Sequence, residues 1–308
     1  MTVQNSCTLD SLIEEYKQHQ RRTRGLREIT LQNYERFVRL SLGAALGDGP
    51  VDPAQLSPSD VMGFVATLRG RYCPHSMKAV RTALRSFLRF LRVKGLCDGR
   101  LEAAIPAVAH WRLSTLPRCL SDEQLDQLLA SLDASSTPCG LRDRAIVLCL
   151  STLGLRPGEV AALHLEDLDW RRGIINLRTR KTRQGAVVPL PRDAGNAIVE
   201  YLRLERPRTG ERHVFVQHLG QRRGVPISSG VVTGAVARAL LRAGLEAPLA
   251  GAYLLRHTIA CRLVCRGTSL KELDDLLGHR CLDTTTIYAK LNVPALSEVA
   301  LPWPEVTR

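Results

Sequence analysis

Four short segments in the second half of the chain contain residue types that can bind an anion or move a proton. The first, Gly-Leu-Arg-Pro-Gly-Glu from residue 154, has a proline suited to the first position of a helix and Glu159 in the first turn. Arg156 would then lie beside a helix N-terminus, where backbone N–H groups favour an anion. The alternative is an ordinary arginine in a capping region.

The second segment is the basic run 178–185, with Lys181 near its centre, ahead of Val-Val-Pro-Leu at 187–190. No acidic residue occurs from Trp170 to Arg192. A basic hairpin of this kind is typical of a contact to a DNA backbone or of a solvated loop. A lysine that is desolvated or surrounded by cations has a lowered pKa, so Lys181 is also a candidate proton donor.

The third segment runs from Tyr253 to His257 and contains Arg256, and the fourth contains His279 and ends in Thr-Thr-Thr-Ile-Tyr at Tyr288. Taken alone, a histidine or a tyrosine is far more often a packing residue than a reacting group, and a single arginine is unremarkable. The joint occurrence is informative, because arginine, lysine, arginine, histidine and tyrosine follow one another, each in its own local sequence pattern.

The composition favours nucleic acid as the anionic partner. The 308 residues include 43 Lys and Arg against 30 Asp and Glu, which gives a net charge of +13. A soluble basic protein without such a partner is the alternative. With 44% hydrophobic and 24% charged residues, the chain should fold, and its length suits two domains.

Membrane, secreted and metal-binding classes lack support in the sequence. No apolar run approaches the roughly 18 residues of a membrane span, and residues 1–10 lack the apolar core of a signal peptide. The nine cysteines are scattered without a Cys-x-x-Cys pair. We therefore expect a cytoplasmic protein with reduced thiols and without a metal site or cofactor.

The elements that would position these residues differ between the two halves of the chain. Apolar residues at helical spacing predict that the first hundred residues are nearly all helical. The predicted helices there are Leu9–Gln20, Thr30–Leu46, a helix capped by Ser57 or Ser59 that ends at Leu68, and Ser76–Lys94.

The last of these helices has a basic face. Its cations recur every three or four positions, at Lys78, Arg81, Arg85, Arg89 and Arg92. Residues 74–97 contain no Asp or Glu, so the carboxylates that normally alternate with cations on an exposed helix are missing. We expect Lys78, Arg81, Arg85 and Arg89 to contact DNA phosphates, with a solvated face as the alternative.

Residues 98–114 lose the helical periodicity and suit a linker. We predict a helical DNA-binding domain at 1–108, a linker at 109–118 and a larger domain at 119–308 that mixes helices with a small sheet. Its expected strands are Ile174–Arg178, Ala186–Leu190 and His213–Val216. One expected helix begins at Ser121. The others span Ala145–Leu153, Asp193–Leu204, Val231–Ala243, Ala252–Cys265 and Ser269–Leu277.

The four segments together resemble the motifs of the tyrosine recombinases, also called the phage integrase family. The block from His279 to Tyr288 is the most specific, and the patterns around Arg156, Lys181 and Arg256 match as well. The helical first half is similar to the core-binding, SAM-like domain of that family. The resemblance implies a mainly α fold with a small antiparallel β-sheet in the second domain, and a two-domain C-shaped clamp on duplex DNA.

The resemblance also implies a role for each residue. Tyr288 is the expected nucleophile on a DNA phosphate, and Arg156 and Arg256 would hold the non-bridging oxygens without a metal. Lys181 would protonate the leaving 5′-oxygen, and His279 would donate a hydrogen bond to the phosphate. The hairpin cations Arg178, Arg180 and Arg183 are expected DNA contacts.

One position departs from the family pattern. Tyr253 stands where the motif usually begins with histidine, and a phenol is a poor base near neutral pH. We expect Tyr253 to take part of that role and the protein to be active. His257, at the usual position after Arg256, is expected to have a packing or supporting role.

The expected function is site-specific recombination through a covalent 3′-phosphotyrosine and a Holliday junction, with four protomers on two DNA sites. The compact chain resembles Xer-like and transposon-borne members, and Tyr253 favours a mobile-element recombinase over one that resolves chromosome or plasmid dimers. A second recombinase or an accessory protein is a possible partner, and residues 294–308 are a candidate contact to a neighbouring protomer. A type IB topoisomerase and a non-enzymatic DNA-binding accessory protein are the alternatives from other classes.

Overall fold

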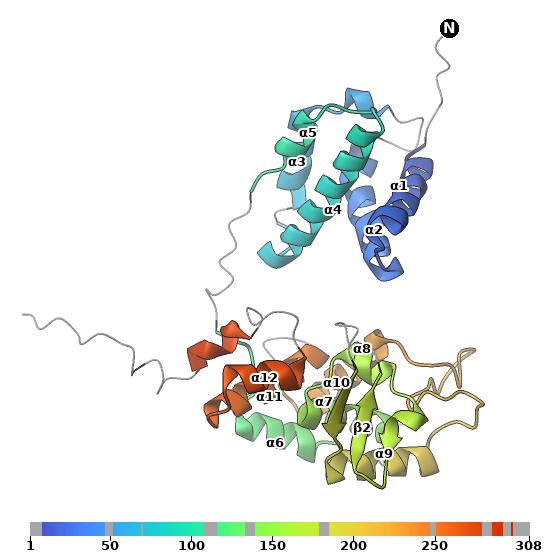
Figure 1. Cartoon of the computed structure of the whole chain (residues 1–308), viewed down its shortest axis with the longest axis vertical. Coiled ribbons are helices and arrows are strands. Elements are labelled where there is room, and N and C mark those ends of the chain that lie inside the picture. The colour runs from blue at the N-terminus through green and yellow to red at the C-terminus, as the bar shows by residue number, and fades with distance from the viewer. Residues whose placement is uncertain are drawn as a thin grey trace, which may run out of the picture. The chain divides into compact units, whose positions relative to one another are not determined.

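The computed structural model describes residues 8–46, 52–68, 70–107, 116–132, 139–178, 185–246, 251–278, 285–291 and 297. The chain divides into two compact units, 1–112 and 113–308, and each is described by itself (Figure 1). Lys181, Arg180, Arg183, His279 and nearly all of segment 294–308 lie outside the described residues.

Unit 1 is helical, as expected from the spacing of its apolar residues. Its elements are α1 (Leu9–Arg24), α2 (Glu28–Leu46), a short 3-10 helix (Pro53–Gln55), α3 (Pro58–Leu68), α4 (Pro74–Val93) and α5 (Arg100–Ala103). The side chain of Thr8 caps α1 by accepting a hydrogen bond from the backbone of Ser11, and Gly25 ends the helix in the left-handed conformation.

The apolar face of α4 forms much of the core of unit 1. Val80, Leu84, Phe87, Leu88 and Leu91 recur at helical spacing on this face, and all five are fully buried. Tyr16 of α1 packs edge-on against Phe87, and its hydroxyl lies 2.9 Å from the Ser86 hydroxyl. Burying side chains of this size stabilises the unit by roughly 1.5–3 kcal/mol each. The opposite face of α4 is therefore free to carry cations.

The segment 98–114, which lacks helical periodicity in the sequence, contains a short helix that its composition did not reveal. Arg100–Ala103 forms α5, and Leu101 and Ile105 are buried in the core of unit 1. The helix has only 4 residues, and Leu101 is its one buried residue, so no helical periodicity marks it in the sequence. Leu101 and Ile105 thus belong to the packed part of unit 1, ahead of the predicted linker at 109–118.

Unit 2 combines helices with a small sheet, as expected. Its helices are α6 (Asp122–Ala130), α7 (Gly140–Leu153), α8 (Pro157–Ala161), α9 (Arg192–Leu204), α10 (Ser229–Arg242), α11 (Ala252–Cys265) and α12 (Leu270–Leu277). Two 3-10 helices span Leu165–Asp167 and Thr286–Leu291. The central helix α7 is buried on most of its surface and packs against α9, α10 and α11 (Figure 1).

The sheet is antiparallel, with strand order β1 (Leu168–Asp169), β2 (Ile174–Leu177), β3 (Ala186–Pro189). Leu168 is opposite Ile175, which is in turn opposite Val188. The fold class predicted from the sequence is therefore confirmed.

The prediction of a third strand at His213–Val216 is wrong. Its ends form only isolated bridges, from His213 to His164 and from Val216 to Pro226. Val214, Phe215 and Val216 are fully buried, so this apolar run reflects burial in the core of unit 2 and not pairing in the sheet. The actual third strand, β1, has 2 residues and is too short to give a pattern.

None of the described helices is long and apolar enough to cross a membrane. The seven described cysteines are free thiols.

Candidate active site

Arg156 is the N-cap residue of α8, and Pro157 and Glu159 occupy the first turn as predicted. The Arg156 guanidinium donates from Nη1 to Glu159 Oε1 at 2.8 Å and from Nη2 to the Gly278 carbonyl at 2.7 Å. Glu159 also accepts from the backbone N–H of Arg156 at 2.9 Å. Because Glu159 is itself buried, these contacts hold the guanidinium in one orientation.

Arg256 lies in the first part of α11 and is only 5% exposed. Its guanidinium donates to the Gly154 carbonyl at 2.5 Å and to the Leu277 carbonyl at 2.6 Å. Gly154 has φ of +61°, and a Cβ there would lie 3.2 Å from a methyl carbon of Leu277. A glycine therefore allows the end of α7 to approach the end of α12 closely.

The two arginines converge on one place. Arg156 binds the carbonyl of Gly278 and Arg256 binds that of Leu277, and both carbonyls belong to the C-terminal end of α12. A helix C-terminus attracts cations, because its unpaired carbonyls carry partial negative charge. The next residue in the chain is His279. Three of the four segments singled out in the sequence thus meet within unit 2.

Tyr288 is buried, at 2% exposure, on the 3-10 helix Thr286–Leu291. Its phenol oxygen lies 2.7 Å from Nδ1 of His257. Burial raises the pKa of the Tyr288 phenol, the Cys261 and Cys119 thiols also raise it, and the positive charge of Arg256 opposes the rise. The phenol is therefore protonated near neutral pH, and the charge of Arg256 favours its ionised form.

His257 makes a contact that its sequence pattern did not indicate. It lies next to Arg256 on α11 and contacts the phenol of Tyr288, although 31 positions separate the two residues in the chain. Burial lowers the pKa of the His257 imidazole, and the charge of Arg256 lowers it further. The imidazole is therefore neutral near pH 7.

Two other predicted residues are described but stand apart from this cluster of contacts. Tyr253 is 53% exposed near the start of α11. Arg178 pairs through Nε with Asp167, whose carboxylate is buried. A role for Tyr253 beside the phosphate and a DNA contact from Arg178 remain predictions.

The basic face of α4 has neutralising partners that the sequence of the helix does not contain. Arg89 and Arg92 pair with the two carboxylate oxygens of Glu102 on α5, at 3.2 Å and 3.0 Å. Arg85 donates to the Ile105 carbonyl at 3.3 Å. Burial and the nearby Arg85 lower the pKa of Arg81. The carboxylate missing from α4 is thus supplied in part by the next helix.

We expect the triple substitution of Arg81, Arg85 and Arg89 by alanine to weaken binding to all DNA sequences alike. Each lost phosphate contact should reduce the slope of log affinity against log salt by about one unit. Binding titrations at several salt concentrations, on specific and random duplexes, measure the slope. An unchanged slope would identify the basic face as merely solvated.

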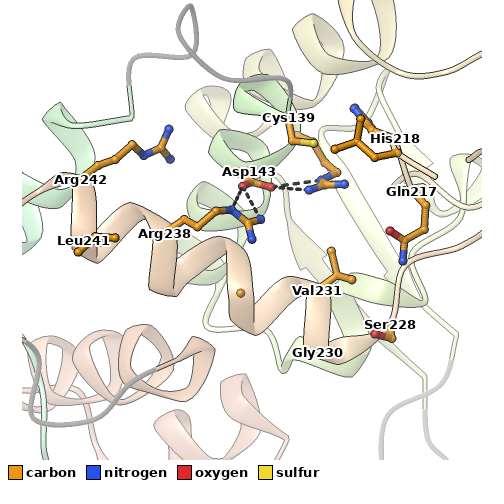
Figure 2. Close-up of a pocket in the computed structure, with 13 residues that line it drawn as sticks. Cys139, Asp143, Gln217, His218, Ser228, Gly230, Val231, Arg238, Leu241 and Arg242 are labelled. Atoms are coloured by element: carbon orange, nitrogen blue, oxygen red, sulfur yellow. Dashed lines mark hydrogen bonds and ion pairs between the residues drawn. The ribbon is translucent and has the colours of Figure 1, made fainter.

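A pocket of about 700 Å³ lies elsewhere in unit 2, between α7, α10 and the segment 217–219. Figure 2 shows Asp143 in this pocket, where its buried carboxylate accepts from Arg142 at 3.0 Å and from Arg238 at 2.6 Å. No residue predicted from the sequence to be catalytic lines it. Among the described residues, no three His, Cys, Asp or Glu side chains are arranged to hold a metal ion together.

The sequence is similar to known protein families along both units. The pattern of the phage integrase family matches residues 118–294, and that of the phage integrase N-terminal SAM-like domain matches residues 13–95. The chain is 41% identical over 300 residues to the putative integrase/recombinase y4rA of Sinorhizobium fredii, covering 97% of this chain and 72% of that protein. It is 31% identical to the tyrosine recombinase XerD of Listeria monocytogenes, covering 94% and 97%.

Solved structures share the fold. The recombinase XerH in a post-cleavage complex with its difH substrate aligns with a TM-score of 0.71 at 21% identity, over 95% of this chain and 85% of that one. The Tn1549 transposon integrase bound to a circular-intermediate DNA aligns with a TM-score of 0.68 at 15% identity, over 94% and 99%.

Proposed function

The chain belongs to the phage integrase family and is a tyrosine site-specific recombinase, and from this premise we propose which residues carry its reaction and which process it serves. Tyr288 attacks a DNA phosphate, forms a covalent 3′-phosphotyrosine, and later releases the strand to a new 5′-hydroxyl. Two such exchanges pass through a Holliday junction.

The observation that carries this proposal is the convergence of Arg156, Arg256 and Tyr288. The arginines are anchored to adjacent carbonyls at the end of α12, and the phenol of Tyr288 contacts His257, the residue after Arg256 on α11. Each guanidinium is a planar fork of N–H donors, a geometry that suits paired hydrogen bonds to the oxygens of a phosphate. Both can therefore face the non-bridging oxygens of one phosphate.

In the cleavage step, the Tyr288 oxygen forms a bond to phosphorus while the bond from phosphorus to the 5′-oxygen breaks. Arg156 and Arg256 stabilise the extra negative charge of the pentacoordinate transition state, an effect worth about 3–4 kcal/mol for one well-placed donor. Lys181 protonates the leaving 5′-oxygen, and His279 donates a hydrogen bond to the phosphate. The phosphotyrosine conserves the energy of the broken bond, so rejoining needs neither ATP nor a metal ion.

Residues 1–108 form the proposed DNA-binding domain and residues 119–308 the catalytic domain, joined by 109–118. The phosphate contacts of the first domain are Lys78, Arg81, Arg85 and Arg89, while Arg178, Arg180 and Arg183 contact DNA from the second. Tyr253 steadies a non-bridging oxygen in place of the usual histidine. Four protomers act on two duplex sites in the cytoplasm, where the substrate DNA is, with residues 294–308 as the candidate contact between protomers.

Integration or excision of a mobile element is the process that we favour. The relatives named putative integrase/recombinase support it, with 41% identity for y4rA against 31% for the XerD protein. Tyr253 also departs from the histidine expected in a housekeeping recombinase. Resolution of chromosome or plasmid dimers is the second candidate, because the chain covers 97% of the XerD protein.

A nicked suicide substrate tests the proposed function. The nick lets the 5′-end diffuse away after cleavage, so a recombinase accumulates as a covalent protein–DNA adduct. Synthetic duplexes taken from the DNA that flanks the gene supply the sites. We expect an adduct and the transfer of strands between two sites, without added metal or ATP. Relaxation of site-free plasmid without strand transfer would identify a topoisomerase, and binding without an adduct would identify an accessory protein.

A further inference from the structure

We propose that His257 receives the phenolic proton of Tyr288 as Tyr288 attacks the DNA phosphate. The proposal rests on the proposed function and adds a catalytic residue to it. The starting observation is the distance of 2.7 Å between His257 Nδ1 and the Tyr288 phenol oxygen. In the tautomer that carries its proton on Nε2, Nδ1 accepts a hydrogen bond from the phenol.

The proton must leave Tyr288 for the reaction to proceed. A neutral phenol is a weak nucleophile, and burial makes this phenol harder to ionise than an exposed one. In the proposed step the O–H bond of Tyr288 breaks, its proton moves to Nδ1 of His257, and the phenol oxygen bonds to phosphorus. A separate proton reaches the leaving 5′-oxygen from Lys181, so each proton has a defined donor and acceptor.

The charges around the pair suit this transfer. Among the described residues, the charged and titratable groups that act on the pair are Arg256, Cys119 and Cys261. In the free protein Arg256 opposes protonation of His257, which keeps the imidazole neutral and ready to accept. A phosphate bound to Arg256 offsets that positive charge, so the imidazolium becomes less costly when DNA is present.

His257 also provides an imidazole on α11, where Tyr253 stands in place of the histidine of the family pattern. The family pattern has histidine at that position, one helical turn before His257. Tyr253 is 53% exposed and has no ring nitrogen to accept a proton, whereas His257 Nδ1 lies 2.7 Å from the Tyr288 phenol oxygen. His257, one turn after Tyr253 on α11, is therefore the residue of the two that can accept the phenolic proton of Tyr288.

The test measures the rate of adduct formation between pH 5 and pH 9 on a substrate with sulfur in place of the bridging 5′-oxygen. The thiolate leaves without a proton, so the profile is independent of Lys181. For the wild type we expect a tenfold fall per pH unit below the pKa of His257 and a plateau above it. His257→Asn keeps a hydrogen-bond acceptor but cannot take a proton. Its rate at pH 7 should fall by about 10²-fold or more and should rise continuously with pH.

His164→Asn is the matched control. His164 is a half-buried histidine of the same unit whose Nδ1 lies 2.9 Å from the Ala162 carbonyl, and its variant should keep the wild-type profile. Added imidazole should partly restore His257→Ala, and DNA affinity checks that each variant is folded.

Two results would overturn the role of His257. One is a wild-type rate of adduct formation that does not fall at acidic pH, a result that can be obtained without any variant. The other is a His257→Asn profile lowered equally at every pH, which would mean that the residue only positions Tyr288. A wild type that forms no adduct at any pH would instead refute the proposed function.

Discussion

Tyr288→Phe should abolish adduct formation on the nicked substrate, because phenylalanine has no oxygen that can bond to phosphorus. The ring can stay in its buried position, so the fold should survive. The lost hydrogen bond to His257 should cost about 1 kcal/mol of stability. DNA affinity should be nearly unchanged, since a buried hydroxyl contributes little to phosphate binding. Gel separation of protein–DNA adducts measures the first effect and a binding titration the second.

Tyr253→Phe is the control for the loss of a hydroxyl from this region, and it should still form an adduct. If Tyr288→Phe retained the adduct and Tyr253→Phe lost it, the exposed tyrosine at the start of α11 would be the nucleophile. Mapping the DNA-linked peptide of the wild type decides the same question directly.

Lys181→Ala should cleave ordinary DNA more slowly by a factor on the order of 10²–10⁴, the range for a lost general acid. The 5′-phosphorothiolate substrate should recover most of that loss, because its leaving thiolate needs no proton. Single-turnover cleavage of the two substrates gives the ratio that identifies the acid.

Tyr253→Phe should lose less activity than Lys181→Ala and should show no selective recovery with sulfur. Tyr253→His should be active, because it restores the residue usual in the family. Recovery of Tyr253→Phe by sulfur, with Lys181→Ala inactive on both substrates, would make Tyr253 the proton donor and Lys181 a DNA contact.

The local parts of the site could be predicted from the sequence. Pro157 and Glu159 start α8 by rules that act within one turn, so they place Arg156 at its N-cap without knowledge of the fold. The helix that carries Arg256 was also expected with its observed bounds, Ala252–Cys265. The resemblance to the family grouped these residues, because their meeting at the end of α12 depends on tertiary packing.

Other features could not be predicted, for the same reason. The contact between His257 and Tyr288 joins residues 31 positions apart, and neither sequence pattern marks the other as its partner. Glu102 pairs with Arg89 and Arg92 from another helix, and the absence of carboxylates along α4 does not reveal such a partner. The short apolar run that contains Phe215 predicted a strand, but the segment is buried without pairing in the sheet. A run of that length does not distinguish a strand from another buried segment.

Tyr288 belongs to a small core that is separate from the main core of unit 2. Its buried members are Ala260, Cys261, Val264, Leu273, Leu277 and Tyr288, from α11, α12 and the 3-10 helix. Proteins open in cooperative pieces, and each opening costs a free energy set by the surface that the piece buries. We therefore expect the 3-10 helix to open at a lower cost in free energy than global unfolding, while α7 and its neighbours stay closed. Amide hydrogen exchange would then detect the segment that carries Tyr288, the proposed nucleophile, as a region of weak protection beside a strongly protected scaffold.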